Sequence, residues 1–230
     1  MAHVHLEDGA FDIVSVLIWS AAAAGVIALA LWRLKGARLQ THKLAIGSMA
    51  AAVAFAASQI EIPVFGGLHL NLTPLIGILV GPSLGTLCVL VINVFGAAIG
   101  HGGWGMIGAN TLVNVVEVTL GFYAYLLLRK ALKLSRFASG FGAATIALTV
   151  SAFVAVAIVA ISGIQGSTQT KAEILGNMMV FAFANIATGI FEGVVTGYIV
   201  KFLGRVRPDL LGDPVDASQK EHRAEVAADV

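Results

Sequence analysis

Residues 139–163 read SGFGAATIALTVSAFVAVAIVAISG, and none of them carries a charged side chain. An α-helix rises about 1.5 Å per residue, so this stretch forms a helix of roughly 37 Å. The hydrocarbon core of a bilayer is about 30 Å thick, and about 20 apolar residues are needed to cross it. The stretch is therefore typical of a transmembrane helix.

The rest of the chain has the same character. Of its 230 residues, 58% are hydrophobic and 12% are charged, whereas soluble domains carry about 25% charged residues. No soluble fold of this length buries so much apolar surface, so lipid must cover it. Six further helices are predicted near 12–32, 43–60, 71–81, 84–99, 106–128 and 174–203. We expect an all-α membrane protein, a bundle of about seven transmembrane helices in the plasma membrane.

Two of these segments, 71–81 and 84–99, are short for a bilayer, and Gly81-Pro82-Ser83 separates them. Proline cannot continue a helix, so the chain is expected to turn there. The segments form either two short, tilted spans or a re-entrant pair. We prefer the interpretation with seven spans.

Basic residues indicate the orientation. Four lie between the first two predicted helices, four between the fifth and sixth, and five after the seventh, which leaves only Lys171 elsewhere. Cytoplasmic loops carry an excess of Lys and Arg, so the side with thirteen is expected to be cytoplasmic. With seven spans the N-terminus is then outside and the C-terminus in the cytoplasm. Residues 1–207 are expected to form the transmembrane domain, and the polar residues 208–230 a disordered cytoplasmic tail.

Several functions are excluded by composition and motif. A net charge of +1 gives no concentrated basic face, so no nucleic-acid partner is expected. Cys88 is the only cysteine, which excludes an internal disulfide and a zinc cluster of thiolates. The chain has no G-x-x-x-x-G-K-[ST] motif and hence no P-loop ATPase site of its own. Gly81-Pro-Ser-Leu-Gly85 matches a G-x-S-x-G nucleophile pattern by chance, because it lies at a cytoplasmic turn without the strand-to-helix context.

Four of the six histidines fall in segments expected on the outer face: His3, His5, His69 and His101. Neutral imidazole is the commonest metal ligand in proteins. An N-terminal amine, a backbone amide and a nearby imidazole can bind one metal in a plane, and such nitrogen sites suit Ni(II) or Cu(II). If Met1 is removed, Ala2 supplies the amine and His3 the imidazole, and one corner is left for another histidine. If Met1 stays, Met1-Ala2-His3 supplies four nitrogens by itself. The alternative is that these residues are a frayed outer end without a ligand.

Other polar residues lie beside these histidines or within the spans. Glu61 and Asn71 stand at the two ends of the outer segment that holds His69, and with His101 they are secondary candidates for the metal site. Glu117 and Glu192 fall within spans, where buried carboxylates are costly and are expected to face the interior of the bundle. The asparagines of the spans are expected to join helices rather than bind a ligand; they are Asn93, Asn110, Asn114, Asn177 and Asn185.

Three stretches carry a family resemblance: Val4-His-Leu-Glu-Asp-Gly9, residues 66–82 (GGLHLNLTPLIGILVGP) and residues 102–114 (GGWGMIGANTLVN). They resemble the CbiM/NikM family, the nickel- or cobalt-binding membrane components of energy-coupling-factor transporters. The first looks like the family's opening Met-His-Ile-x-[Asp/Glu]-Gly, the second like its loop and third helix, and the third like its glycine-rich loop before a Gly-Ala-Asn helix start. The likeness covers roughly residues 4–203.

The resemblance implies a metal held by the N-terminal amine, the amide and imidazole of the second residue, and a loop histidine that His69 matches. This chain has three residues ahead of Val4-His5, and three explanations stay open. Val4 is the true start, which makes His5 the second residue. Alternatively Met1 is removed, which makes His3 second, or both histidines join a remodelled site.

The leading hypothesis is the substrate-capture component of an ATP-driven nickel or cobalt importer, with Ni(II) or Co(II) as the transported substrate and 1–207 as the metal-capture domain. The resemblance implies a coupling transmembrane subunit, ATPase subunits and a small accessory membrane protein as partners. The alternative is a membrane-embedded metalloenzyme using the same histidines, which needs an open coordination position and a nearby general base. A scaffold without a ligand is disfavoured by the clustered outer histidines.

Overall fold

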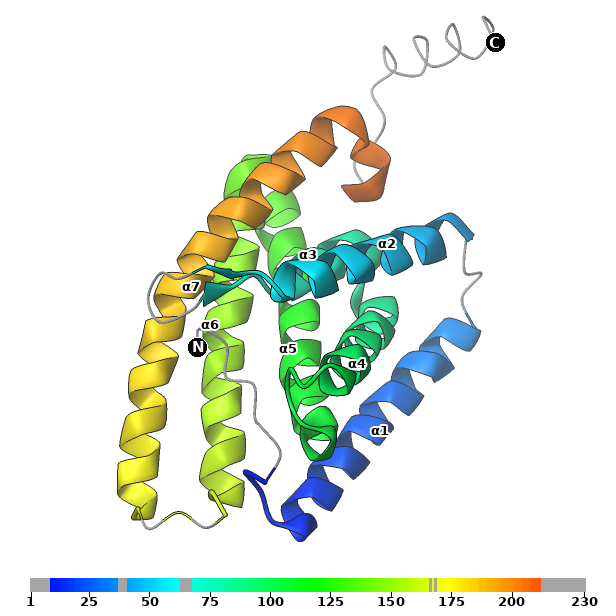
Figure 1. Cartoon of the computed structure of the whole chain (residues 1–230). Helices are drawn as coiled ribbons and strands as arrows, with labels where there is room; N and C mark the ends of the chain where they lie inside the picture. Colours follow the sequence, from blue (N-terminus) through cyan, green and yellow to red (C-terminus); the bar gives the residue numbers. More distant parts are fainter. Residues whose placement is uncertain (1–8, 37–40, 63–67, 166, 168, 212–230) are drawn as a thin grey trace, which may run out of the picture.

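The computed structural model describes residues 9–36, 41–62, 68–165, 167 and 169–211. Within them it has seven α-helices, a two-stranded hairpin and three short helical turns (Figure 1). The elements are α1 (Ile13–Lys35), α2 (Thr41–Ser58), β1 (Glu61–Ile62), β2 (Leu68–His69), α3 (Thr73–Val80), α4 (Pro82–Ala98), η1 (Trp104–Met106), α5 (Ile107–Leu126), η2 (Leu127–Ala131), α6 (Arg136–Ser162), α7 (Lys171–Val206) and η3 (Pro208–Leu211). The expected all-α bundle of about seven helices is confirmed.

Four of these helices are long and apolar enough to cross a membrane: α1, α5 with its flanking turns, α6 and α7. The α6–α7 interface is the most extensive in the bundle, and α5 packs on the other side of α6, while α1 lies obliquely against α4 and α5 (Figure 1). The two segments expected to be short are short. With eight residues α3 is roughly 12 Å long, which is less than half the thickness of the bilayer core.

Local capping explains where several helices begin. The Asp12 side chain accepts a hydrogen bond from the Ser15 N–H at 3.1 Å, which caps α1. Ser135 caps α6 in the same way, and Thr170 and Glu173 form a reciprocal capping box at α7. Each cap satisfies an N–H that has no partner within its helix. These capping residues fix where the helices begin, which hydrophobicity alone predicts only approximately.

Glycines at four-residue spacing bring α3 and α4 close to α5. A Cβ on Gly77 would lie 2.1 Å from the carbonyl oxygen of Val118, and a Cβ on Gly85 would lie 2.5 Å from the Val118 side chain. Between them Gly81 has φ +83°, a conformation that favours glycine, and forms the turn before Pro82. The expected close approach of helices at these small residues is confirmed.

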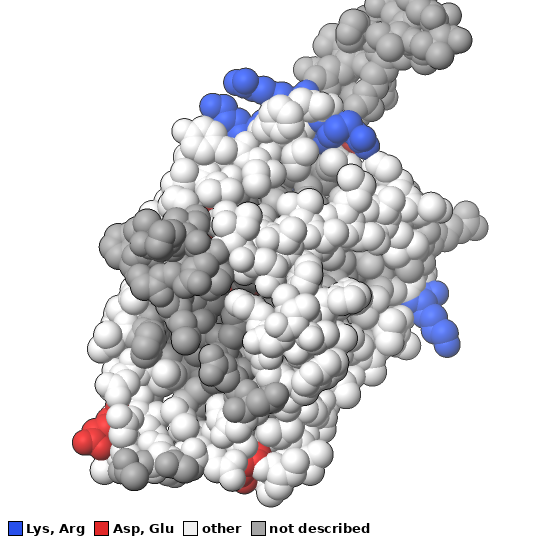
Figure 2. Space-filling view, in the orientation of Figure 1, with Lys and Arg blue, Asp and Glu red and all other residues white. Residues whose placement is uncertain are grey.

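Charged side chains separate toward opposite ends of the bundle. In Figure 2 the Lys and Arg side chains gather at the upper and right edges, and most visible Asp and Glu side chains lie at the lower edge. The upper edge holds the α5–α6 connection and the C-terminal end of α7, and is called the basic end from here on; the opposite end holds the start of α1 and the α6–α7 connection (Figure 1). This separation agrees with the charge pattern of the sequence. That the basic end is cytoplasmic stays a prediction.

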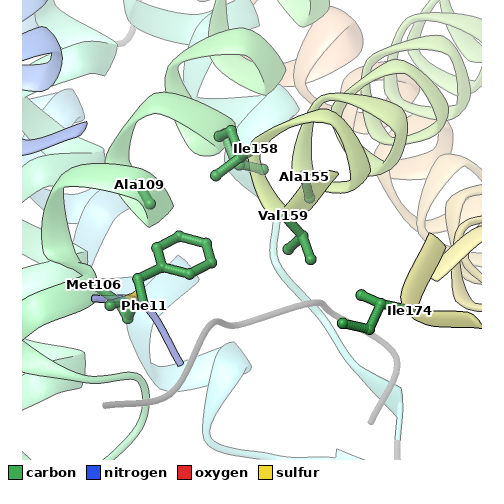
Figure 3. Packing of buried hydrophobic residues seen from close by; sticks show 8 residues of the cluster. Phe11, Met106, Ala109, Ala155, Ile158, Val159 and Ile174 are labelled. Atoms are coloured by element: carbon green, nitrogen blue, oxygen red, sulfur yellow. The ribbon is translucent and has the colours of Figure 1, made fainter. Parts of the chain in front are cut away.

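The chain before α1 is fixed in the end opposite to the basic end. Phe11 is only 3% exposed and packs in a cluster with residues of η1, α5 and α6 such as Met106, Ala109 and Ile158 (Figure 3). Its neighbour Ala10 accepts a hydrogen bond from the N–H of Gln165 at 2.9 Å. The first described residues are therefore tied to the bundle before α1 begins.

The other terminus also contacts the bundle. After α7, the turn η3 buries Pro208 and Leu211, and Leu211 packs in a cluster with Leu75, Ile78 and Tyr125. Residues 208–211 thus contribute to the core. The remainder of the predicted tail, 212–230, lies outside the described residues, so its disorder and the boundary at residue 207 stay predictions.

Candidate functional site

A polar cavity of about 30 Å³ lies among α5, α6, α7 and the segment before α3. This volume holds about one ion or one or two water molecules. Its polar lining comes from four segments that are distant in sequence: Asn71, Asn110, Asn114, Glu117, Ser151, Asn185 and Thr188. In a bilayer, such a concentration of polar side chains needs internal partners or a ligand.

Glu117, on α5, bonds to side chains from two other segments of the bundle. It is 3% exposed, and its carboxylate accepts hydrogen bonds from Asn71 Nδ2 at 2.6 Å, from Ser151 Oγ at 2.8 Å and from Thr73 Oγ1. One carboxylate thereby joins the start of α3 to α5 and α6. Asn71 and Thr73 are held in place by side-chain bonds to a single buried group.

A second carboxylate holds Leu72, the residue between Asn71 and Thr73. Glu192, on α7, is fully buried and accepts a hydrogen bond from the Leu72 backbone N–H. Leu72 has φ 52°, a left-handed conformation that costs a non-glycine residue about 1–3 kcal/mol. Residues 71–73, called the anchored segment from here on, are thus fixed by two carboxylates from two different helices. The expectation that both acids face the interior of the bundle is confirmed.

The anchored segment follows the hairpin that contains His69, with Leu70 between the two. β1 pairs antiparallel with β2, with Glu61 opposite His69 in the register. His69 is two residues before Asn71, so their Cα atoms lie within about 7 Å of each other. The backbone positions of Glu61, His69 and Asn71, three candidates from the sequence, are therefore brought together beside the cavity.

His101 lies in the loop between α4 and η1, and its side chain is half-buried. Its backbone N–H bonds to the Gly96 carbonyl at 2.8 Å. The next residue, Gly102, packs beside Asn110, because a Cβ on Gly102 would be 3.4 Å from Asn110 Nδ2. Since Asn110 lines the cavity, this glycine-rich loop lies along the cavity wall.

Three of the predicted ligands, Ala2, His3 and His5, lie outside the described residues. Among the residues that the structure does describe, no three His, Cys, Asp or Glu side chains gather as a metal site. The cavity lining supplies carboxylate, amide and hydroxyl groups, whose hard oxygens suit Mg²⁺ or Ca²⁺, while imidazole suits nickel and other late transition metals. Imidazole ligands would have to come from His69, His101 and the N-terminal segment.

Sequence reasoning identified some of this site and missed the rest. Glu117, Glu192 and Asn71 were singled out, but Thr73, Ser151 and Thr188 were not, because Ser and Thr are common in transmembrane helices. A signal was available, since each acid within a span requires partners. The expectation that asparagines join helices holds for Asn93 of α4, which donates to Thr111 and accepts from Asn114, both at 3.2 Å and both on α5. Asn177, in contrast, is exposed.

The family described as CbiM, cobalt uptake substrate-specific transmembrane region, matches residues 5–210 of this chain. The chain belongs to the CbiM family. It is 28% identical over 213 residues to a protein of Archaeoglobus fulgidus named as a fused nickel transport protein, NikMN, a match that covers 90% of this chain and 68% of the relative. It is 30% identical over 213 residues to a metal transport protein of Haloquadratum walsbyi, covering 90% and 93%. Against the cobalt transport protein CbiM of Sorangium cellulosum, identity is 27% over 214 residues, covering 90% and 94%.

Solved structures share the fold of this CbiM-family chain. A truncated transition metal transporter superposes with a TM-score of 0.76 at 20% identity and covers 87% of this chain and 98% of its own. A second transition metal transporter has a TM-score of 0.75 at 21% identity, covering 88% and 93%. At this identity the likeness concerns the fold.

Family membership decides between the hypotheses drawn from the sequence. The chain is a multi-pass transmembrane component of a cobalt and nickel uptake family. The relatives named above are named for metal transport and not as enzymes. The resemblance to CbiM/NikM is confirmed, and the metalloenzyme alternative is not favoured.

Proposed function

We propose that this chain is the substrate-capture component of an ATP-driven, energy-coupling-factor type importer, and that it binds Ni(II) or Co(II) on the outer face. The ligands would be the N-terminal nitrogens, the imidazole of His3 or His5 or both, and His69. Residues 1–207 would form the capture domain, with Glu61, Asn71 and His101 around the ion.

The observation that carries this proposal is the anchored segment. A ligand on a loop binds tightly only if its backbone is held in position before the ion arrives. Asn71 and Thr73 bond to Glu117, and Leu72 bonds to Glu192, directly after His69. This gives the backbone of the loop histidine a rigid attachment.

The N-terminal end of the chain has a matching anchor. The cluster that holds Phe11 includes Val113 and Ala155, and both of these residues also line the polar cavity. His5 is six residues before Phe11, and six residues reach at most about 20 Å. This chain length permits the N-terminal nitrogens and His69 to bind the same ion.

Energy would be supplied by other subunits, because the sequence has no P-loop. We propose a coupling transmembrane subunit, ATPase subunits and a small accessory membrane protein as partners. The purified chain, reconstituted alone, should bind metal but should not concentrate it against a gradient. ATP-driven accumulation by the isolated chain would contradict this division of labour.

The direct test is isothermal titration of the purified full-length chain with Ni(II) and Co(II), combined with N-terminal sequencing. His69→Ala should weaken binding strongly without abolishing it, since it removes one ligand and leaves the chelating terminus. A tag that blocks the amine should weaken binding more, because it removes a ligand on which the fused chelate rings depend.

His3→Ala and His5→Ala distinguish the three starts. Only His5→Ala should matter if Val4 is first, mainly His3→Ala if Met1 is removed, and both in a remodelled site. His42→Ala is the matched control, because His42 is exposed beside Arg207, away from the cavity. Equal affinity in the tagged, His69→Ala and His42→Ala proteins would mean that the metal binds elsewhere.

A further inference from the structure

A second cavity, lined by positive charge, opens at the basic end of the bundle. It measures about 560 Å³ and lies where η2, the start of α6 and the end of α7 meet. Four cations line it: Arg129, Arg136, Lys201 and Arg205. None of its lining residues is Asp or Glu, and the nearby Asp209 pairs with Arg207 at 2.8 Å. The cavity therefore carries a strong net positive charge.

The four cations are presented at different depths. Arg136 is half-buried and packs on the backbone of Gly204, since a Cβ on that glycine would overlap its side chain. Arg129 is also half-buried, and its Nη1 donates to the Leu134 carbonyl at 3.0 Å. Lys201 and Arg205 are exposed at the mouth and lie one helical turn apart on α7. Two half-buried guanidinium groups and two exposed cations make a suitable cradle for a phosphate group.

Aromatic and apolar side chains continue from this cavity along the outside of the bundle. Tyr198 lies edge-to-face with Phe137 at 4.9 Å between ring centroids, and both line the cavity. Tyr198 is 60% exposed, which is typical of a residue at the membrane interface. Val194 and Phe191 lie four and seven residues earlier in α7, on the same helix face, and are 37% and 44% exposed.

We propose that this cavity binds the headgroup of an anionic phospholipid. The phosphate would lie among Arg129, Arg136, Lys201 and Arg205, and the acyl chains would run past Tyr198 along Val194 and Phe191. The apolar track is the reason to choose a lipid over free phosphate or an acidic peptide, because a water-soluble anion has no use for it. Basic cavities between helices at the cytoplasmic side of membranes commonly hold such headgroups.

Native mass spectrometry of the purified full-length chain tests this, with titration of phosphatidylglycerol, phosphatidylcholine and inorganic phosphate. Phosphatidylglycerol should bind more tightly than phosphatidylcholine, and inorganic phosphate should not compete at matched concentration. Each cation near an anionic lipid contributes about fivefold to binding. The Lys201→Gln, Arg205→Gln double variant should therefore lose phosphatidylglycerol affinity by roughly 25-fold and should lose much less affinity for phosphatidylcholine, whose choline cation offsets the charge of its phosphate.

Arg33→Gln combined with Lys35→Gln is the matched control, since both residues are in the last turn of α1 and neither lines the cavity. It should change phosphatidylglycerol binding by less than about twofold. A Val194→Ser variant should weaken both lipids, because it interrupts the apolar track. Equal binding of the two lipids, equal losses in the two double variants, or phosphate binding as tight as the lipid would overturn the proposal.

Discussion

Replacing Glu117 tests whether the anchored segment holds the metal-capture loop. In Glu117→Leu, Asn71 Nδ2 and Thr73 Oγ1 lose their acceptor, whereas Ser151 keeps a bond to the Leu148 carbonyl at 3.0 Å. Two buried donors are then unsatisfied. A buried donor without a partner costs about 1–3 kcal/mol, but side-chain bonds within membranes average only about 0.6 kcal/mol, with a maximum near 1.7. We therefore expect Glu117→Leu to lower the free energy of unfolding by about 1–3 kcal/mol. The values measured in membranes favour the lower part of this range.

The same change should lower the affinity for the metal. If ordering of residues 71–73 must then occur on binding, a cost of about 2 kcal/mol corresponds to roughly a 30-fold weaker Kd. Glu117→Gln should behave differently, because its amide oxygen can accept from Asn71 and Thr73 while its NH₂ donates to Ser151 Oγ. The expected Kd of Glu117→Gln is within about threefold of the unchanged protein.

Thermal unfolding in detergent, with and without Ni(II), and isothermal titration measure both effects. Glu117→Leu should unfold earlier and bind more weakly, and Glu117→Gln should do neither. If Glu117→Gln lowered stability and metal affinity as much as Glu117→Leu, the charge of the carboxylate, and not its hydrogen-bonding geometry, would be what holds the segment. If Glu117→Leu bound metal normally, the bonds from Asn71 and Thr73 to Glu117 would not be needed to position His69.

Three further outcomes are expected. In a background without Cys88, cysteines placed at the exposed positions Ser167 and Leu132 should react with impermeant reagents from outside and from inside, respectively. Labelling of Leu132→Cys from outside would show that the orientation is the reverse of the one expected. Gly77→Ala should lower the free energy of unfolding by more than about 3 kcal/mol, because the new Cβ would overlap the Val118 carbonyl. The control Gly176→Ala, whose Cβ meets open space, should change it by no more than about 1 kcal/mol. Metal affinity should fall by at least about tenfold per pH unit below pH 7, because the amine, with a pKa of about 8, must lose its proton to bind, and the backbone amide and the imidazoles must be deprotonated as well. A flat titration series between pH 6 and pH 8 would argue against an amine ligand.

The sequence by itself determined the membrane class, the seven helices and the candidate ligands. Long uncharged stretches such as 139–163 can only be covered by lipid, and α6 indeed spans Arg136–Ser162. His69 and the three family-like stretches were recognisable because they are local: each depends on residues close together in the chain. The charge pattern is local in the same sense, and it separates toward opposite ends in the folded bundle (Figure 2).

Only the tertiary structure decided what these residues do together. Glu117 and Asn71 are 46 positions apart, and Glu192 and Leu72 are 120 apart, so no sequence pattern links either pair. Likewise the basic cavity combines Arg129 with Lys201 and Arg205, which belong to different clusters in the sequence. The hydrophobic effect requires that the apolar face of a helix be buried, but it does not specify which neighbouring helix buries it. Hydrogen bonds are specific to partner and distance, so the polar contacts that shape both cavities depend on how the helices pack.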